Sequence, residues 1–180
     1  MDSSITYQEL GQQASDFAAY LQHDLGLVKG DKFAIMIPNL LQYPIALFGA
    51  LIAGLTVVNV NPLYTPRELQ HQLKDSGAKS ILILENFAHV LETVIDKTDI
   101  NQVILTGVGD RLSAIKGAVV NCVLKYVKKQ VPAYNLPGAV KFNKAMAKGA
   151  KLSYMPVAVK GDDLAFLQYT GGTTGPSTVI

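Results

Sequence analysis

The sequence predicts a doubly wound α/β fold, in which helices cover both faces of a largely parallel sheet. Two observations lead to this prediction. Over residues 1–108, short apolar segments alternate with longer segments of helical periodicity. The short segments are apolar at nearly every position, as strands are when both faces of their sheet are covered.

Two of the helices begin with a capping box, in which a threonine stands three positions before a glutamate. The first follows Thr6 and is predicted over residues 7–23. The second follows Thr65, has proline in its first turn, and is predicted over residues 66–76. Gly77 comes directly after it, where a helix-terminating glycine belongs.

The other elements are predicted from apolar periodicity and from the glycines and prolines between them. We expect strands at residues 33–37, 55–60, 80–84 and 102–105, and helices at residues 40–53 and 87–97. The longest nearly unbroken apolar run, residues 45–58, has 14 residues. A membrane-spanning helix needs about 18 or more, so this run is interpreted as buried core.

The composition describes one globular domain of 180 residues, 49% of them apolar and 17% charged. Acidic and hydroxyl residues at positions 2–4 do not resemble a signal peptide, so secretion is not expected. The single Cys122 cannot form an internal disulfide. The histidines have no Cys or His at ligand spacing, so no metal site is predicted.

A basic block interrupts the alternating pattern after residue 108. From Arg111 to Lys151 there are nine basic residues and no acidic one, so 16 − 9 = 7 bases and all 14 acids lie elsewhere. A helix predicted over residues 112–130 has an apolar arc of Ile115, Val119, Cys122, Val123, Tyr126 and Val127. We therefore divide the chain into an α/β layer at 1–108, a basic amphipathic insertion at 109–157, and a strand with a loop at 158–180.

Three interpretations of the basic block are open. A solvated charged face is the default for any lysine run. Nucleic-acid binding is disfavoured, because the aromatic residues are too sparse for a stacking platform. We favour a pair of interfacial helices, at residues 112–130 and 142–150, that lie on anionic lipid. The membrane-surface candidates are Lys125, Lys128 and Lys129, which lie opposite the apolar arc, and Lys116, which lies among the apolar residues.

A strand predicted at residues 164–169 leads into a loop rich in glycine and threonine. The candidate binding residues are Tyr169, Thr170, Gly171, Gly172, Thr173, Thr174 and Gly175. Glycines allow consecutive N–H groups to converge on one point, and threonine hydroxyls add donors, which suits a polyphosphate. A glycine-rich turn without a ligand is the alternative, because neither standard nucleotide motif fits the spacing.

These seven residues resemble the signature phosphate loop of the acyl-adenylate-forming enzymes. Five further segments, in the right order along the chain, resemble the bacterial long-chain fatty acid–CoA ligase branch: residues 38–44, 59–69, 75–78, 86–89 and 162–168. The resemblance implies that the chain is a partial N-terminal AMP-binding domain of an ATP-dependent acid–thiol ligase that forms AMP. We interpret it as a fragment of such an enzyme.

The resemblance also implies the reaction and its partners. A long-chain fatty acid carboxylate attacks the α-phosphate of ATP to give an acyl-adenylate and pyrophosphate, with magnesium as the metal of the intact enzyme. The thiol of coenzyme A then displaces AMP to give acyl-CoA. Such an enzyme of fatty acid metabolism is expected in the cytoplasm, peripheral at the inner face of the membrane.

Two departures from the family pattern limit what this chain is expected to do. Thr178 stands where the family has a phosphate-contacting lysine, and family members are roughly three times as long, at about 150 residues per domain. We assign no catalytic residue and expect the chain alone to be inactive.

Exposed sheet edges are expected to promote self-association into homo-oligomers. The alternatives are a non-catalytic lipid- or membrane-binding module and a fragment of another acyl- or aryl–CoA ligase.

Overall fold

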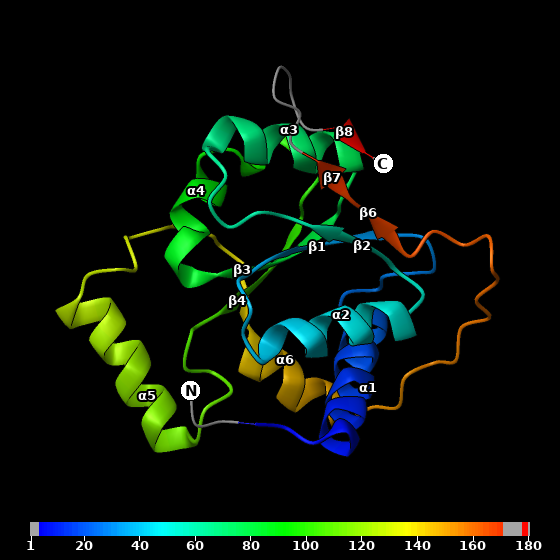
Figure 1. The fold of residues 1–180 in the computed structure, drawn as a ribbon, viewed down its shortest axis with the longest axis horizontal. Coiled ribbons are helices and arrows are strands. Elements are labelled where there is room, and N and C mark those ends of the chain that lie inside the picture. Colours follow the sequence, from blue (N-terminus) through cyan, green and yellow to red (C-terminus); the bar gives the residue numbers. More distant parts are fainter. Residues whose placement is uncertain (1–3, 171–177, 180) are drawn as a thin grey trace.

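The computed structural model describes residues 4–170 and 178–179. Within this part of the chain, a six-stranded parallel sheet has the order β5-β4-β3-β1-β2-β6 (Figure 1). The chain moves from β1 to β2 on one side and then crosses to β3 on the other, so the prediction of a doubly wound sheet is confirmed. The strands are β1 (Lys32–Met36), β2 (Thr56–Asn59), β3 (Ser80–Leu84), β4 (Gln102–Thr106), β5 (Val140–Lys141) and β6 (Phe166–Leu167).

Helices cover both faces of the sheet (Figure 1). One face carries α1 (Tyr7–His23), α2 (Gln42–Ile52) and α6 (Phe142–Gly149), and the other carries α3 (Pro66–Ser76) and α4 (Ala88–Glu92). Side chains alternate between the faces along a strand. Phe33 and Ile35 of β1 therefore join the apolar cluster under α1, whereas Ala34 and Met36 join the cluster under α3.

Both capping boxes are formed, and the two helices that they begin have the predicted bounds. The Thr6 N–H donates to Glu9 Oε2 at 2.7 Å, and the Thr65 N–H donates to Glu68 Oε2 at 2.8 Å. Gly77 ends α3 with a φ of 62°, in the left-handed region that favours glycine. The helix starts and the end of α3 depend only on residues a few positions apart, and for this reason the sequence predicts them well.

The single helix predicted at residues 87–97 is wrong. The chain forms three short pieces instead, η1 (Glu85–Phe87), α4 and η2 (Ile95–Lys97). The Val94 N–H donates to the oxygen of Leu91, three residues back, and the Thr93 hydroxyl donates to the oxygen of Val90. Bonds of this shorter period tighten the backbone and interrupt a regular α-helix.

The predicted insertion at residues 109–157 is too wide, because its middle belongs to the core. β5 pairs with β4 at the edge of the sheet, and α6 packs against α1. The ring of Phe142 is fully buried, with its centroid 5.4 Å from that of Phe17. The apolar side of α6 is therefore covered by protein, so the expected second interfacial helix at residues 142–150 is wrong.

The other basic helix stands away from the layer. It consists of α5 (Ala114–Cys122) and a π-helical turn, η3 (Val123–Val127), and Figure 1 shows it well separated from α6. In residues 4–170 and 178–179, no helix has the length and apolar character needed to cross a membrane.

The strand predicted at residues 164–169 divides into two. β6 extends the parallel sheet beside β2, whereas β7 (Tyr169–Thr170) pairs in antiparallel fashion with β8 (Thr178–Val179). The change of partner occurs at Gln168. The ring of Tyr169 joins the apolar cluster under α3 instead of continuing along β2.

Candidate functional site

Tyr169 is the candidate binding residue whose side chain the structure describes. Only 6% of it is exposed, and its hydroxyl donates to Asp75 Oδ2 of α3 at 2.6 Å. Burial and the neighbouring Asp75 carboxylate both raise the pKa of Tyr169, so its hydroxyl stays protonated and remains a donor. β7 is thereby held against α3.

The rest of the proposed phosphate loop is described only in part. The backbone of Thr170 lies in β7. Gly171, Gly172, Thr173, Thr174 and Gly175 lie outside the described residues. The phosphate-binding assignment of these residues stays a prediction.

A group of polar side chains, which the sequence analysis did not identify, lies where β2 ends. The Tyr43 hydroxyl donates to Asn59 Oδ1 at 3.0 Å, and Asn59 Nδ2 donates to Gln168 Oε1 at 3.5 Å. The Gln72 amide donates to the Asn59 backbone oxygen at 2.8 Å. Ligands of open α/β sheets bind beyond the carboxyl ends of the strands, so the position of Asn59 was the signal that could have identified this group.

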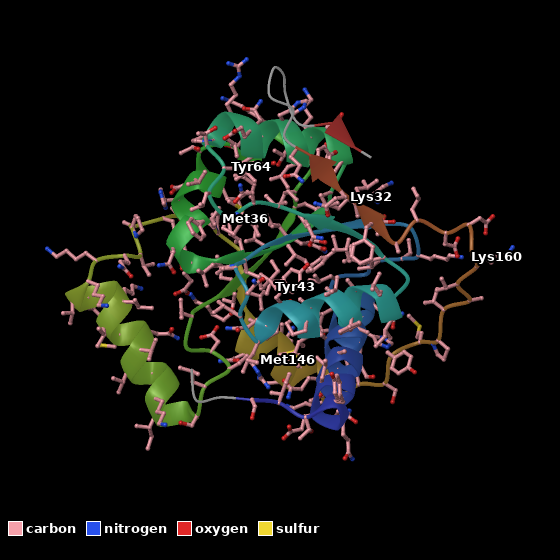
Figure 2. The ribbon with its side chains drawn as sticks, in the orientation of Figure 1. Lys32, Met36, Tyr43, Tyr64, Met146 and Lys160 are labelled. Atoms are coloured by element: carbon pink, nitrogen blue, oxygen red, sulfur yellow. The ribbon has the colours of Figure 1, made fainter. Side chains whose placement is uncertain are left out.

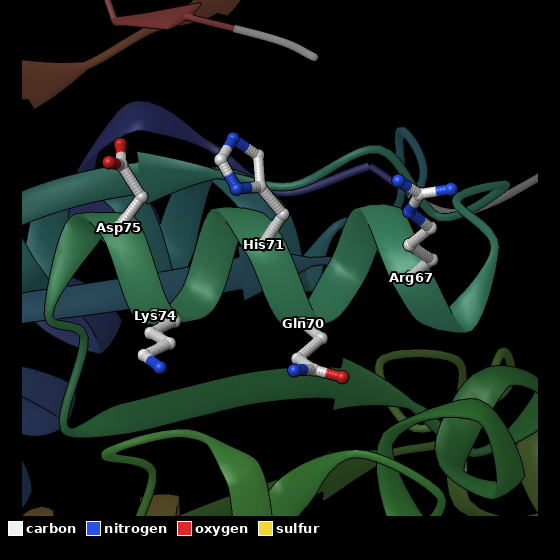
Figure 3. Close-up of a pocket in the computed structure, with 5 residues that line it drawn as sticks. All are labelled: Arg67, Gln70, His71, Lys74 and Asp75. Atoms are coloured by element: carbon white, nitrogen blue, oxygen red, sulfur yellow. The ribbon is translucent and has the colours of Figure 1, made fainter.

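A hollow lies on the outer side of α3 (Figure 3). Figure 3 shows Arg67, His71 and Asp75 pointing to one side of the helix, and Gln70 and Lys74 pointing to another. The hollow is rich in basic side chains, but its carboxylate, Asp75, is bound to the Tyr169 hydroxyl. Asp75 therefore connects this surface with the start of β7.

The described residues offer no ligand set for a metal. In residues 4–170 and 178–179, no three His, Cys, Asp or Glu side chains gather in a way that could hold an ion. The magnesium that the family resemblance implies does not fit this part of the chain, so no step is derived through it.

The second candidate surface is the exposed surface of α5 and η3, which we call the α5 surface. It consists of Ile115, Val119, Tyr126 and Val127 and the neighbouring lysines Lys116, Lys125, Lys128 and Lys129. The four apolar side chains are 57–81% exposed, and all four lysines are exposed. The Lys125 ammonium lies 5.7 Å from the centroid of the Tyr126 ring. Four residues of the predicted apolar arc are therefore exposed, and so are the three lysines predicted to lie opposite it.

The loop before α5 attaches that helix to the layer. Asn121 Nδ2 donates to Asp110 Oδ1 at 2.9 Å, and the Gly109 N–H donates to Asn121 Oδ1 at 2.8 Å. The Gly107 N–H donates to Asp110 Oδ2 at 2.8 Å. Gly109 and Gly117 are in backbone contact, because a Cβ on Gly109 would lie 2.5 Å from the Gly117 oxygen. This attachment orients the α5 surface away from the sheet.

The six-stranded parallel sheet with helices on both faces defines the class of fold as a doubly wound α/β domain. Residues 1–177 match the family described as "AMP-binding enzyme". The chain belongs to this family of AMP-binding enzymes.

The particular relatives are CoA ligases. The long-chain-fatty-acid–CoA ligase of Salmonella typhimurium is 59% identical over 175 residues, which are 97% of this chain and 31% of the relative. The ligase of the same name from Bacillus subtilis is 33% identical over 95% of this chain and 30% of its own length. The 4-coumarate–CoA ligase-like 9 of Oryza sativa is 30% identical over 97% of this chain. The chain spans 26–31% of the length of these ligases.

Solved structures share the fold. An anthranilate CoA ligase in complex with anthranoyl-AMP superposes with a TM-score of 0.77 at 17% identity, over 99% of this chain and 30% of its own. A long-chain-fatty-acid–CoA ligase from Archaeoglobus fulgidus gives a TM-score of 0.69 at 23% identity, over 99% of this chain and 30% of its own. The chain has the fold of part of these enzymes.

Proposed function

We propose that this chain forms part of a long-chain fatty acid–CoA ligase, which activates a fatty acid with ATP and transfers the acyl group to coenzyme A. The observation that carries the proposal is the 59% identity to the Salmonella typhimurium ligase over 97% of this chain. The aryl alternative is disfavoured, because the relative named for 4-coumarate is only 30% identical over the same share of the chain.

In this proposal the segment from Tyr169 to Gly175 holds the phosphates of ATP. Adenylation transfers a nucleotidyl group, so positioning and charge neutralisation contribute most of the catalysis. Backbone N–H groups and threonine hydroxyls are suitable donors to phosphate oxygens. Thr178 occupies the position of the family lysine, so the positive charge has to come from another part of the enzyme, as does any magnesium ligand.

A chimera tests the proposal. This chain replaces the 175 aligned residues of the Salmonella typhimurium ligase, and formation of acyl-CoA and AMP is measured with fatty acid, ATP and coenzyme A. We expect activity that requires all three substrates and that exceeds activity with 4-coumarate. A folded, soluble chimera without such activity overturns the proposal.

We further propose that the α5 surface lies on an anionic membrane, at the cytoplasmic face where fatty acids are taken up. Exposed apolar residues beside lysines support this, because interfacial helices combine apolar burial with attraction to anionic headgroups. Each basic residue near such a surface contributes about 1 kcal/mol. The attachment through Asp110 and Asn121 supports it too, since it presents the arc outward.

Vesicle binding tests this placement. Replacing Lys125, Lys128 and Lys129 by glutamine should lower affinity for phosphatidylglycerol-containing vesicles about 100-fold, from three contributions of about 1 kcal/mol each. The matched control replaces three exposed lysines elsewhere, Lys74, Lys97 and Lys144. Equal losses of vesicle affinity in both variants, or binding that does not depend on anionic lipid and salt, contradict the proposal.

Lipid binding without ligase activity in the chimera would favour the non-catalytic module.

We also propose that the isolated chain self-associates through the edge of its sheet. The support is β6, a two-residue edge strand in which Phe166 is exposed, with the exposed Leu164 two residues before it. Light scattering coupled to size-exclusion chromatography should show species larger than a monomer, which Phe166→Lys should reduce. A stable monomer at high concentration contradicts this.

A further inference from the structure

We propose that Asp75 is a positioning residue for the glycine- and threonine-rich segment, because it binds Tyr169 and thereby sets the position of β7 after the chain leaves the parallel sheet. This inference rests on the proposed function, in which that segment holds the phosphates of ATP. Asp75 lies in sequence 94 positions before Tyr169, and its place on α3 gave no sign of this role.

The tether works because Tyr169 is held at both ends of its side chain. The ring is buried in the apolar cluster that also contains Leu69 and Leu73 of α3, and the hydroxyl donates to Asp75. A tyrosine side chain has only two main rotatable torsions, so fixing its ring and its hydroxyl restricts the backbone at residue 169. The chain continues directly from this residue into Thr170, with about 3.8 Å between successive Cα atoms.

Backbone pairing does not attach Tyr169 to α3. β6 pairs with β2 through Phe166 and Leu167, and β7 pairs with β8. The next side-chain contact, from Asn59 Nδ2 to Gln168 Oε1, is 3.5 Å long and lies at the limit for a hydrogen bond. The contact from Tyr169 to Asp75 is 2.6 Å and charge-assisted, which makes it the stronger of the two. The Asp75 carboxylate therefore links Tyr169 to α3.

Asp75 is not needed for the packing of its own helix. α3 packs on the sheet through buried residues such as Leu69, Gln72 and Leu73, whereas Asp75 is exposed and lines the hollow on the outer side. Removing its carboxylate is therefore expected to release Tyr169 while α3 stays in place. This separates a positioning role from a general role in stability.

The test uses the active chimera and compares Asp75→Ala with Tyr169→Phe, which remove the same hydrogen bond from opposite ends. Each should raise the KM for ATP about 5- to 10-fold, with the KM for fatty acid unchanged. The double variant with Asp75→Ala and Tyr169→Phe should raise the KM for ATP little beyond either single variant, because both remove the same interaction. Asp75→Asn should restore most of the ATP affinity, since the amide oxygen still accepts from the hydroxyl.

Lys74→Ala is the matched control, because Lys74 neighbours Asp75 but points to another side of α3 (Figure 3). It should leave both KM values unchanged. An unchanged KM for ATP in both Asp75→Ala and Tyr169→Phe overturns the inference, as does an equal rise in both KM values with a lower melting temperature. If one variant is insoluble, the other still breaks the bond and decides the question. An inactive but folded parent chimera would instead overturn the proposed function.

Discussion

The contact between Gly109 and Gly117 makes the attachment of α5 sensitive to a single methyl group. A Cβ on Gly109 would lie 2.5 Å from the Gly117 oxygen, against about 3.4 Å for an ordinary contact, so the two segments must separate by roughly 0.9 Å. Gly109 does not have a positive φ, so alanine brings no backbone strain of its own. The effect of Gly109→Ala is therefore expected to be steric.

The free-energy cost of Gly109→Ala follows from the contacts that this separation breaks. It lengthens the 2.8 Å hydrogen bond from the Gly109 N–H to Asn121 beyond 3.5 Å, at a cost of about 1 kcal/mol. Overpacking adds about 1–3 kcal/mol. A total of about 2–4 kcal/mol corresponds to a 30- to 1,000-fold more frequent opening of α5.

Hydrogen–deuterium exchange of the 180-residue chain measures this opening directly. Peptides covering residues 114–127 should exchange faster in Gly109→Ala, whereas the strands β1 and β3 should be unaffected. Gly11→Ala is the control, because Gly11 lies in α1 with no heavy atom within 4 Å of an added Cβ. Unchanged exchange at residues 114–127, or equal acceleration throughout the sheet, would refute the reasoning.

Three further predictions concern stability and activity. Phe142→Ala should lower the free energy of unfolding by about 3–5 kcal/mol in urea denaturation, since the ring is fully buried, whereas Lys144→Ala should change it by less than about 0.5 kcal/mol. Burial raises the pKa of Asp31, but hydrogen bonds from Lys79 and the Val28 N–H outweigh it and leave the pKa below its usual value. Its carboxylate therefore stabilises the fold above an unfolded pKa of about 3.9, and this stabilisation is lost as the pH falls through the folded pKa. Asp31→Asn should cost about 1–2 kcal/mol at pH 7 and flatten the acid limb of the stability curve, and an equal cost at pH 3 would contradict this. The 180-residue chain alone should form no acyl-CoA above background, and detectable product would contradict that expectation.

The sequence predicted the layer well where the deciding interactions are local. The capping boxes at Thr6 and Thr65 join residues three positions apart, and the predicted helices have the bounds observed in α1 and α3. The strands are recognisable because burial on both faces requires apolar residues at successive positions. For the candidate site, the same local reasoning predicts a phosphate loop from Tyr169 to Gly175, which stays a prediction, and it gave no sign of the contact between Tyr169 and Asp75.

The residues that the sequence analysis missed act across long separations. Asp75 and Tyr169 are 94 positions apart, and Asn59 and Gln168 are 109 positions apart. Neither pair has a local pattern, because a hydrogen bond between distant residues leaves no periodicity in the sequence. The break of the strand predicted at residues 164–169 has the same origin, since it follows from the burial of Tyr169 under α3.

The two basic helices show most clearly which features the sequence predicts and which depend on tertiary packing. Periodicity alone established that α5 and α6 each have an apolar side and lysines, together with the class of fold and the charge of the block. Only the tertiary structure decided that Phe142 of α6 meets Phe17 of α1 in the core, while Val119 of α5 stays exposed. The physical reason is that amphipathic spacing shows that one side of a helix is apolar but not which surface covers it, and that depends on elements distant in sequence.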